Sequence, residues 1–318
     1  MKKIKISLIW IIITSPFILL FLLVILTSNG FFGDLPTFEQ LENPKNNLAT
    51  EIVSEDGVVL GSYFFENRTN IHYDQISKNL INALIATEDV RFEKHSGVDA
   101  RALIRAIVGF FLGDKSSGGA STITQQLAKM LFTEKPSSGI ERVMQKLKEW
   151  VISAQLEKRY TKNEIISMYL NRFDWVNNAV GIKSASNIYF NKPPKELKIE
   201  ESAMLVGMLK NPALYNPNRR IELTKKRRDV VLYQLKKYNF IQDSTYQRLI
   251  KKPIILDFKK ASHNEGLAPY LREYLREKLK KWCKEKTKPD GTNYNLYTDG
   301  LRIITTINSK MQKHAEIA

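Results

Sequence analysis

The pattern of apolar and polar residues divides the chain into an apolar N-terminal stretch, a short alternating segment and a long helical region. The stretch from Leu8 to Leu26 is almost wholly apolar, and it is long enough to cross a hydrocarbon core of about 30 Å. Three lysines precede it: Lys2, Lys3 and Lys5. By the positive-inside rule they keep the N-terminus in the cytoplasm, and the rest of the chain is exported. We therefore expect a cytoplasmic tail at residues 1–7 and a transmembrane helix at residues 8–27.

A cleaved signal peptide is the alternative interpretation of this stretch. The apolar core of a signal peptide normally has about 7–15 residues and ends at small residues of the A-x-A type. Here the apolar run is longer and is followed by Thr27-Ser28-Asn29-Gly30. The length favours an uncleaved anchor, followed by a polar linker at residues 28–48.

A β-hairpin and a series of helices are expected after the linker. Residues 49–63 alternate around Asp56-Gly57, a turn pair typical of hairpins. Beyond them the apolar residues recur at helical spacing. One apolar stripe comprises Ile76, Leu80, Ala83, Leu84 and Thr87, and another comprises Val143, Leu147, Trp150, Val151 and Ala154.

Capping residues indicate where several of these helices begin. Asp99 and Ser121 each stand at a helix start, and Thr161-Lys162-Asn163-Glu164 has the pattern of a capping box. The expected helices are 101–112, 122–131, 162–170, 199–210, 222–238 and 266–285. Residues 301–307 alternate like a strand. The prediction is a mainly α fold with a small β element at each end.

The chain is strongly basic, with a formal net charge of +16 over 318 residues. Long domains are exported regardless of charge, so this excess does not change the expected topology. A basic surface beside a bilayer attracts anionic lipid heads or a substrate that carries pyrophosphate. An exported domain rarely meets nucleic acid, so we expect no nucleic-acid partner. Cys283 is the only cysteine and there are four scattered histidines, which argues against a cysteine or histidine metal site.

The first candidate for chemistry is the segment from Glu88 to Asp99, where an apolar helix gives way to a charged loop. A carboxylate at that junction is partly shielded by the helix end, which suits a general base. An ordinary solvated junction fits the spacing as well.

The second candidate is the segment from Gly118 to Lys129, in which glycines and hydroxyl residues open a helix. Free backbone N–H groups at a helix start bind anions, and Lys129 adds charge two turns further on. A flexible loop before a capped helix explains the same pattern.

The third candidate is a polar helix face formed by Arg142, Lys146, Glu149 and Ser153. Lys146 and Glu149 are either an exposed pair worth about 0.3–0.5 kcal/mol or the cation and second carboxylate of a cleft. A fourth feature, the apolar segment Ala102 to Leu112, is too short to span a bilayer. It is either a core helix or a segment that enters the membrane interface.

Taken in order, these segments resemble the motifs of the peptidoglycan glycosyltransferase domain of class A penicillin-binding proteins. The matching stretches are Glu88-Asp89-x-x-Phe92-x-x-His95-x-Gly97-x-Asp99, Gly119-Ala120-Ser121-Thr122-Ile123-Thr124-Gln125-Gln126-Leu127, Lys146-x-x-Glu149, Tyr169-Leu170-Asn171 and Asn211-Pro212-Ala213-Leu214-Tyr215-Asn216-Pro217. The resemblance covers roughly residues 50–220. It implies a lysozyme-like, mostly helical fold that joins lipid II units into glycan strands.

The resemblance also implies roles for individual residues. Glu88 is expected to be the general base for the acceptor sugar, and Glu149 the second catalytic carboxylate or a ligand of a divalent cation such as Mg or Mn, which is not required. Undecaprenyl pyrophosphate leaves and the anomeric configuration inverts. The expected substrate-binding residues are Asp89, Phe92, His95, Gly119, Ser121, Thr122, Gln125, Gln126, Lys129, Arg142, Lys146 and Asn171.

Two positions depart from the family pattern. Many members have Arg-Lys where this chain has Gln145-Lys146, so one positive charge near the pyrophosphate is absent. Between Asn171 and Gly181 the chain lacks the glycines that many members carry.

The expected domains are a catalytic domain at 49–240 and a helical extension at 241–318. Asp299 to Asn308 resembles the strand that leads into the transpeptidase of bifunctional members, but the Ser-x-x-Lys and Lys-Thr-Gly motifs of that domain do not occur. The interpretation is a bifunctional protein truncated before its transpeptidase domain.

The expected location is the inner membrane, with the catalytic domain on the periplasmic side. The expected partners are lipid II, the growing glycan strand, the membrane and cell-wall synthesis proteins. A hydrolase on the same architecture and a non-catalytic scaffold are the competing functions.

Overall fold

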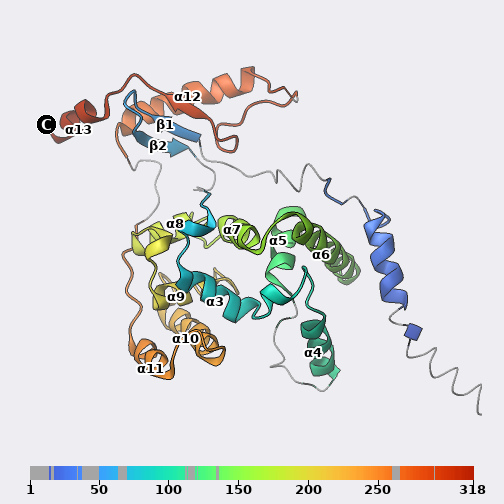
Figure 1. The fold of residues 1–318 in the computed structure, drawn as a ribbon. Helices are drawn as coiled ribbons and strands as arrows, with labels where there is room; N and C mark the ends of the chain where they lie inside the picture. Colours follow the sequence, from blue (N-terminus) through green and yellow to red (C-terminus); the bar gives the residue numbers. More distant parts are fainter. Residues whose placement is uncertain are drawn as a thin grey trace, which may run out of the picture. The chain divides into compact units, whose positions relative to one another are not determined.

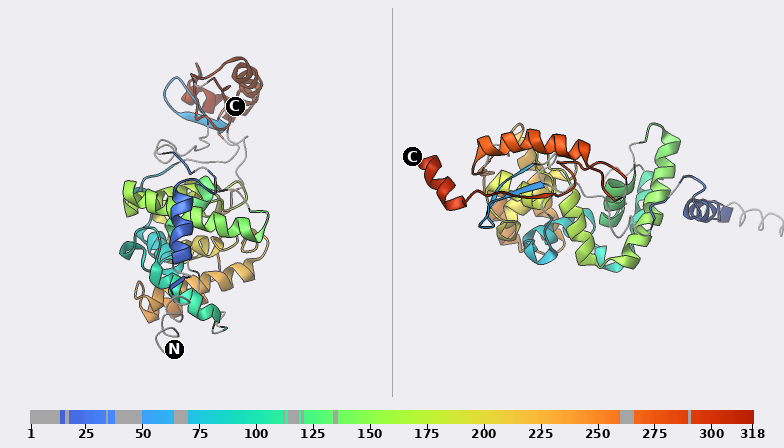
Figure 2. Two further views of the ribbon diagram at one scale, coloured as in Figure 1. Left: turned by 90° about the vertical axis from the view of Figure 1, so that its right-hand side faces the viewer. Right: turned by 90° about the horizontal axis from the view of Figure 1, so that it is seen from above.

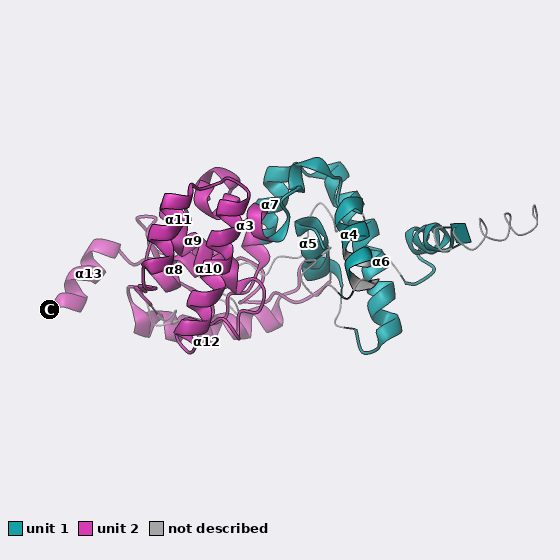
Figure 3. Cartoon of the chain, turned by 90° about the horizontal axis from the view of Figure 1, so that it is seen from below, with its two compact units in different colours: residues 1–44, 88–169 teal, residues 45–87, 170–318 magenta. Residues whose placement is uncertain are grey.

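The computed structural model describes residues 14–15, 18–33, 35–37, 50–63, 70–111, 113, 119, 121–133, 136–259, 266–289 and 291–318. Helices dominate this part of the chain (Figure 1), and three short strands among the described residues form one sheet. The chain divides into two compact units, coloured separately in Figure 3. Unit 1 comprises Met1–Pro44 and Glu88–Tyr169, and unit 2 comprises Lys45–Thr87 and Leu170–Ala318. The mainly α fold class is confirmed.

The predicted tail at 1–7 lies outside the described residues, as do residues 8–13, 16 and 17 of the predicted transmembrane helix. Residues 18–28 are helical, and their apolar side chains are largely exposed, Ile18 by 64% and Phe21 by 68%. No helix of the described part of the chain is both long and apolar enough to span a bilayer. The single-pass anchor therefore stays a prediction.

Unit 1 contains four helices after its N-terminal segment: α4 (Ala100–Phe111), α5 (Ile123–Phe132), α6 (Gly139–Arg159) and most of α7 (Lys162–Arg172). The short 3-10 helix η2 (Phe92–Lys94) precedes α4. Helices α5 and α6 pack against each other. Leu127 and Leu156 are fully buried and belong to the apolar interior of this unit.

The predicted helix starts in unit 1 are confirmed with one exception. Asp99 Oδ1 accepts from the backbone N–H groups of Arg101 and Ala102 at the start of α4. At α7, Glu164 accepts from the Thr161 N–H and the Thr161 hydroxyl accepts from the Glu164 N–H. The predicted cap of α5 is wrong, because the hydroxyl that accepts from the Gln125 N–H belongs to Thr122 and not to Ser121.

The predicted apolar stripe of α6 is wrong in part. Val143 is 55% exposed, whereas Glu149 and Ser153, expected on the opposite polar face, are buried. The Ser153 hydroxyl donates to the Glu149 carbonyl, and the loop at Gly97 passes close to the Ser153 backbone. Glu149 and Ser153 are buried because this part of the polar face packs on the loop at Gly97.

Unit 2 contains the body of α3 (Lys78–Glu88), whose last residue belongs to unit 1, and the final residues of α7. Its other helices are α8 (Ile182–Phe190), α9 (Ile199–Met208), α10 (Ile221–Lys237), α11 (Asp243–Lys251), α12 (Pro269–Glu285) and α13 (Ser309–Ile317), with 3-10 helices η1 (Tyr73–Gln75) and η3 (Pro194–Glu196). Helix α9 is almost wholly buried and packs on α10. The Trp175 indole donates to the Leu205 carbonyl of α9.

The sheet joins the two ends of unit 2. Strands β1 (Thr50–Val53) and β2 (Val59–Tyr63) form the predicted antiparallel hairpin. Strand β3 (Arg302–Ile304) lies within the predicted 301–307 segment and pairs in parallel with β1. Helix α12 lies beside the strands in the views of Figures 1 and 2, and its Cys283 shares a small apolar core with Ile52. The predicted division between 49–240 and 241–318 stays a prediction.

Asp56 connects the hairpin turn to α13. Its carboxylate accepts from the Ser309 N–H at 3.0 Å and from the Ser309 hydroxyl at 2.6 Å. These hydrogen bonds hold the pKa of Asp56 well below its ordinary value of 3.8. A depressed pKa in the folded state contributes stability above the unfolded pKa, and this stability is lost as the pH falls toward the folded pKa.

We therefore expect Asp56→Ala to lower the melting temperature of the chain at pH 7, because α13 loses its capping carboxylate. The difference from the wild type should be constant from pH 8 to pH 5 and shrink as the pH falls below about 4. Thermal unfolding followed by circular dichroism measures it, with the exposed Glu285 at the end of α12 replaced by Ala as the control. A difference that is largest at low pH would contradict this account.

Candidate active site

Glu88 is the last residue of α3 and the first residue of the second segment of unit 1. The side-chain amide of Gln126 donates to Glu88 Oε2 at 2.9 Å. The hydroxyl of Tyr169 in turn donates to the amide oxygen of Gln126 at 2.9 Å. These three side chains come from α3, α5 and α7 and form one chain of hydrogen bonds.

Tyr169 determines which way the Gln126 amide points. Its hydroxyl is a donor to the amide oxygen, so the amide nitrogen faces Glu88. Burial raises the pKa of Tyr169 well above its usual value, and the negative charge of Glu88 adds to the effect. The phenol therefore keeps its proton and remains a donor. Among the described residues, Glu88 Oε1 has no hydrogen-bond partner, and it is available to a substrate.

A second polar cluster lies on the buried face of α6. The Lys146 ammonium donates to Glu149 Oε2 at 2.8 Å and to the Ser121 hydroxyl at 2.8 Å. The Glu149 side chain is 6% exposed, whereas that of Lys146 is 36% exposed. An ammonium has three N–H donors, so Lys146 retains one donor and partial access to solvent.

Both clusters contact the same short segment, residues 121–126. Ser121 at its start binds Lys146, and Gln126 at its end binds Glu88. A carboxylate with a free oxygen and a partly exposed cation are thereby held on one segment of one unit. This arrangement suits proton removal at one place and neutralisation of developing negative charge at another.

The segment itself is fixed by the loop that follows Glu88. Asp89 is buried, and its carboxylate accepts from the Ile123 N–H at the start of α5. The same carboxylate contacts His95 Nε2 at 3.0 Å. The Thr122 hydroxyl donates to the Gly97 carbonyl at 2.6 Å, and the Gln125 amide donates to the same oxygen. The sequence analysis expected an anion at the start of α5. The anion that binds there is the Asp89 carboxylate of the protein itself.

Gly97 allows the loop to approach α6. Its φ is +92°, and a Cβ at this position would lie 2.8 Å from the backbone of Ser153. A side chain there would be strained and would displace the loop from the helix that carries Lys146 and Glu149.

The predicted site residues thus fall into separate groups. Glu88, Gln126, Ser121, Lys146 and Glu149 form the two clusters described above. Five others are used to hold the loop against α5 and are largely buried: Asp89, Phe92, His95, Thr122 and Gln125. Gly119, Lys129 and Arg142 are exposed.

Asn171 lies in unit 2, away from the other predicted residues along the chain. Its side chain accepts from the Ile71 N–H at 3.1 Å and donates to the Ile71 carbonyl at 2.8 Å. A Cβ on Gly181, whose φ is +80°, would come within 3.0 Å of the Asn171 carbonyl. The contacts of Asn171 therefore position the segment before α3.

Glu149 is the residue that the sequence analysis gave as a possible ligand of a divalent cation. Among the described residues, no three or more His, Cys, Asp or Glu side chains gather as metal ligands would. Glu149 is instead paired with the Lys146 ammonium. The positive charge in this cluster comes from a lysine, and no chemical step is assigned to a metal.

Two features of this unit were missed by sequence reasoning. Tyr169 belongs to a recognised motif, but its role in orienting Gln126 depends on a contact between helices that are distant in sequence. The second is a cluster in which Lys162 donates to the His95 carbonyl and to Glu157, while Thr124 donates to Glu157 at 2.6 Å. For the role of Tyr169, the only signal in the sequence is that a buried tyrosine needs a hydrogen-bond partner.

Helix α4 exposes apolar side chains. Ile104 is 61% exposed and Val108 is 50% exposed. Arg101 and Arg105 on the same helix are exposed as well. The alternative that this segment is a core helix is therefore wrong for these positions.

Comparison with known families identifies the part of the chain that contains these clusters. Residues 56–236 match the family model described as Transglycosylase. The chain belongs to the transglycosylase family. This match confirms the resemblance drawn from the motifs, and it includes both polar clusters.

Several relatives of the chain in this family are penicillin-binding proteins 1A. The chain is 33% identical to the protein of that name from Pseudomonas aeruginosa over 282 residues, which cover 88% of this chain and 32% of the relative. It is 32% identical to that of Vibrio cholerae over 301 residues, which cover 93% and 35%. The chain thus spans about a third of the length of these relatives. A crystal structure of penicillin-binding protein 1A from Haemophilus influenzae matches with a TM-score of 0.44 at 21% identity, covering 86% of this chain and 28% of that one.

The position of Asp89 leads to a stability prediction. Asp89→Ala leaves His95 and the Ile123 N–H without their buried partner, which should lower the free energy of unfolding by about 2–4 kcal/mol. Glu93→Ala, an exposed residue of the same loop, should change it by less than about 0.5 kcal/mol. Urea unfolding followed by tryptophan fluorescence compares the two variants. Equal stability of Asp89→Ala and the wild type would show that the contact does not hold the loop.

Proposed function

We propose that this chain is a peptidoglycan glycosyltransferase that polymerises lipid II into glycan strands. The proposal rests on one observation above all: Glu88 and Lys146 bind opposite ends of segment 121–126 in a member of the transglycosylase family. The similarity to penicillin-binding proteins 1A supports a substrate from the cell wall. Residues 49–240 are the proposed catalytic domain, and 241–318 the extension.

In the proposed reaction Glu88 acts as the general base. The 4-hydroxyl of the acceptor sugar donates its proton to Glu88 while its oxygen forms a bond to the anomeric carbon of the donor. Gln126 holds the other carboxylate oxygen, so the free oxygen is presented in a fixed direction. Attack from the face opposite the leaving group inverts the configuration at that carbon.

The bond between the anomeric carbon and the phosphate oxygen breaks, and its electron pair leaves with undecaprenyl pyrophosphate. This leaving group needs its charge neutralised more than it needs a proton. Lys146 is the proposed partner, because Glu149 and Ser121 fix its position and leave one N–H donor free. The exposed Lys129 and Arg142 are the proposed further contacts of the substrate.

The proposed location is the outer face of the inner membrane, with the N-terminus inside. The exposed apolar residues of the helix at 18–28 and of α4 support it. Apolar side chains beside arginines are typical of helices that lie in a membrane interface. A substrate with a lipid tail stays embedded while its sugars reach the catalytic clusters. Cell-wall synthesis proteins are the proposed partners.

The test of the base is Glu88→Gln, which should lower polymerisation of purified lipid II by about 100-fold or more, because the amide cannot accept the proton. The fold should be retained, since Gln126 keeps a partner. Glu93→Gln, an exposed acid on the adjacent loop, is the matched control. Polymerisation that survives in Glu88→Gln would remove Glu88 from this role. Cleavage of finished glycan without any polymer would identify a hydrolase instead.

A second variant tests the cation. Lys146→Met should lower kcat by at least about tenfold, because Lys146 neutralises the leaving group mainly in the transition state. Lys158→Met, at an exposed position of the same helix, should leave kcat within about twofold. Rescue by Lys146→Arg is expected to be partial, since the guanidinium is larger and planar. A Lys146→Met variant with a raised KM and a normal kcat would place Lys146 in ground-state binding only.

A further inference from the structure

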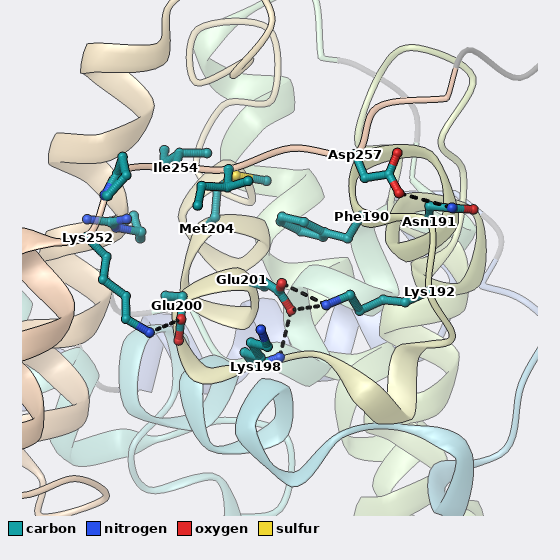
Figure 4. Close-up of a pocket in the computed structure, with 13 residues that line it drawn as sticks. Phe190, Asn191, Lys192, Lys198, Glu200, Glu201, Met204, Lys252, Ile254 and Asp257 are labelled. Atoms are coloured by element: carbon teal, nitrogen blue, oxygen red, sulfur yellow. Dashed lines mark hydrogen bonds and ion pairs between the residues drawn. The ribbon is translucent and has the colours of Figure 1, made fainter.

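The chain that follows α11 is extended, with neither helix nor turn from residue 253 to residue 259. Figure 4 shows it passing from Lys252 to Asp257 along one side of a cavity of about 630 Å³, whose other walls include parts of α8 and α9. This segment lies within unit 2. None of its residues belongs to the two catalytic clusters, so an interaction there is separate from the proposed reaction.

One edge of the segment is attached to the end of α8. The Asp257 N–H donates to the Tyr189 carbonyl at 3.2 Å, and the Lys259 N–H donates to the Ile188 carbonyl at 2.8 Å. The last carbonyls of a helix have no partner within the helix, and these two donors satisfy two of them. The donors are two residues apart, which is the spacing along one edge of a β-strand.

The opposite edge of the segment has no partner. In an extended chain the backbone groups of alternate residues point to opposite edges, so this free edge consists of the N–H and C=O groups of Ile254, Leu256 and Phe258. None of these groups makes a hydrogen bond within the part of the chain that the structure describes. The adjacent Ile255 is 77% exposed. A row of unpaired backbone groups on an extended, accessible chain is a template for another extended chain.

Unpaired lysines stand at both ends of the free edge. Lys251 and Lys259 are exposed and have no oppositely charged partner among the described residues, whereas Lys252 is paired with Glu200 at 2.6 Å. This charge favours a partner strand with acidic residues on either side of apolar ones. A second copy of the segment would place lysines close to lysines, which destabilises a strand pair.

We propose that the free edge of residues 254–258 binds an extended segment of another protein as an added β-strand. The backbone of the partner forms hydrogen bonds with the unpaired N–H and C=O groups of that edge. Acidic residues of the partner lie near Lys251 and Lys259. The hydrogen-bond pattern identifies the ligand as a peptide backbone, and the lysines select its flanking charge.

The probe is a fluorescein-labelled peptide with blocked termini and the sequence Glu-Glu-Val-Thr-Val-Thr-Val-Glu-Glu. Fluorescence anisotropy measures its binding to the purified chain in detergent, and the expected Kd is below about 1 mM. The same peptide with every valine and threonine nitrogen methylated should not bind, because it has no N–H donors for strand pairing. Equal binding of the two peptides overturns the proposal, as does a lack of binding of the unmethylated peptide.

A matched pair of variants tests the free edge. Leu256→Pro removes a donor of that edge and should weaken binding of the peptide by at least about tenfold. Ile255→Pro removes an N–H that points to the other edge and should leave binding within about twofold. The melting temperature of each variant shows whether its fold is retained. An equal loss of binding in both variants, or no loss in either, overturns the proposal.

The flanking charge and the identity of the partner are tested separately. Lys251→Met and Lys259→Met should each weaken binding of the peptide about three- to fivefold. Lys195→Met, an exposed lysine of the η3 helix, should leave it unchanged. Unchanged binding in both flanking variants overturns the proposal. Sedimentation equilibrium covers the alternative occupant: self-association of the chain that Leu256→Pro abolishes would identify a second copy and overturn the proposal as well.

Discussion

The buried carboxylate of Asp89 is the contact on which the rest of unit 1 depends. It binds the first N–H of α5 and the ring of His95, and it is adjacent in sequence to Glu88. The proposed base and the start of α5 are therefore fixed by neighbouring residues of one loop. Gln126 lies one turn into α5 and completes the connection by its hydrogen bond to Glu88.

Two adjacent acids thus have different tasks because their surroundings differ. Asp89 has its oxygens occupied by a backbone N–H and an imidazole. Glu88 has one oxygen held and one without a partner among the described residues. The same distinction separates Glu149, which is buried and paired, from Lys146, which keeps a donor and partial exposure. Asp89 and Glu149, whose oxygens are bound by other groups, fix the geometry. Glu88 and Lys146 are the groups proposed to take part in the reaction.

Local signals in the sequence predicted much of the fold. The hairpin around Asp56-Gly57, the cap at Asp99 and the capping box at Thr161 depend on residues close in sequence, and the structure confirms them. The family motifs also located the two polar clusters. Contacts between distant segments were not predictable: the burial of Glu149 and Ser153 on α6, the use of Thr122 in place of Ser121 as a cap, and the pairing of β3 with β1. Each depends on what a remote segment supplies as a partner.

The motif alone also does not separate residues that touch substrate from those that hold the loop. Thr122 and Gln125 are as prominent in the motif as Ser121 and Gln126, yet their side chains bind the Gly97 carbonyl. Burial makes this distinction, because a side chain enclosed in the protein does not reach a ligand: Thr122 is 2% exposed and Gln125 is 1% exposed. Asn171 is a similar case, since its amide binds the backbone of Ile71.

The central claim is that Glu88 and Lys146 act on the two reactants of one reaction, the acceptor sugar and the lipid-linked donor, from the two ends of segment 121–126. A crystal structure of the chain with an unreactive lipid II analogue and an acceptor sugar tests it most directly. The account predicts the acceptor 4-hydroxyl within hydrogen-bond distance of Glu88 Oε1 and the pyrophosphate in contact with the Lys146 ammonium. A pyrophosphate bound away from Lys146, or an acceptor hydroxyl out of reach of Glu88, would contradict it.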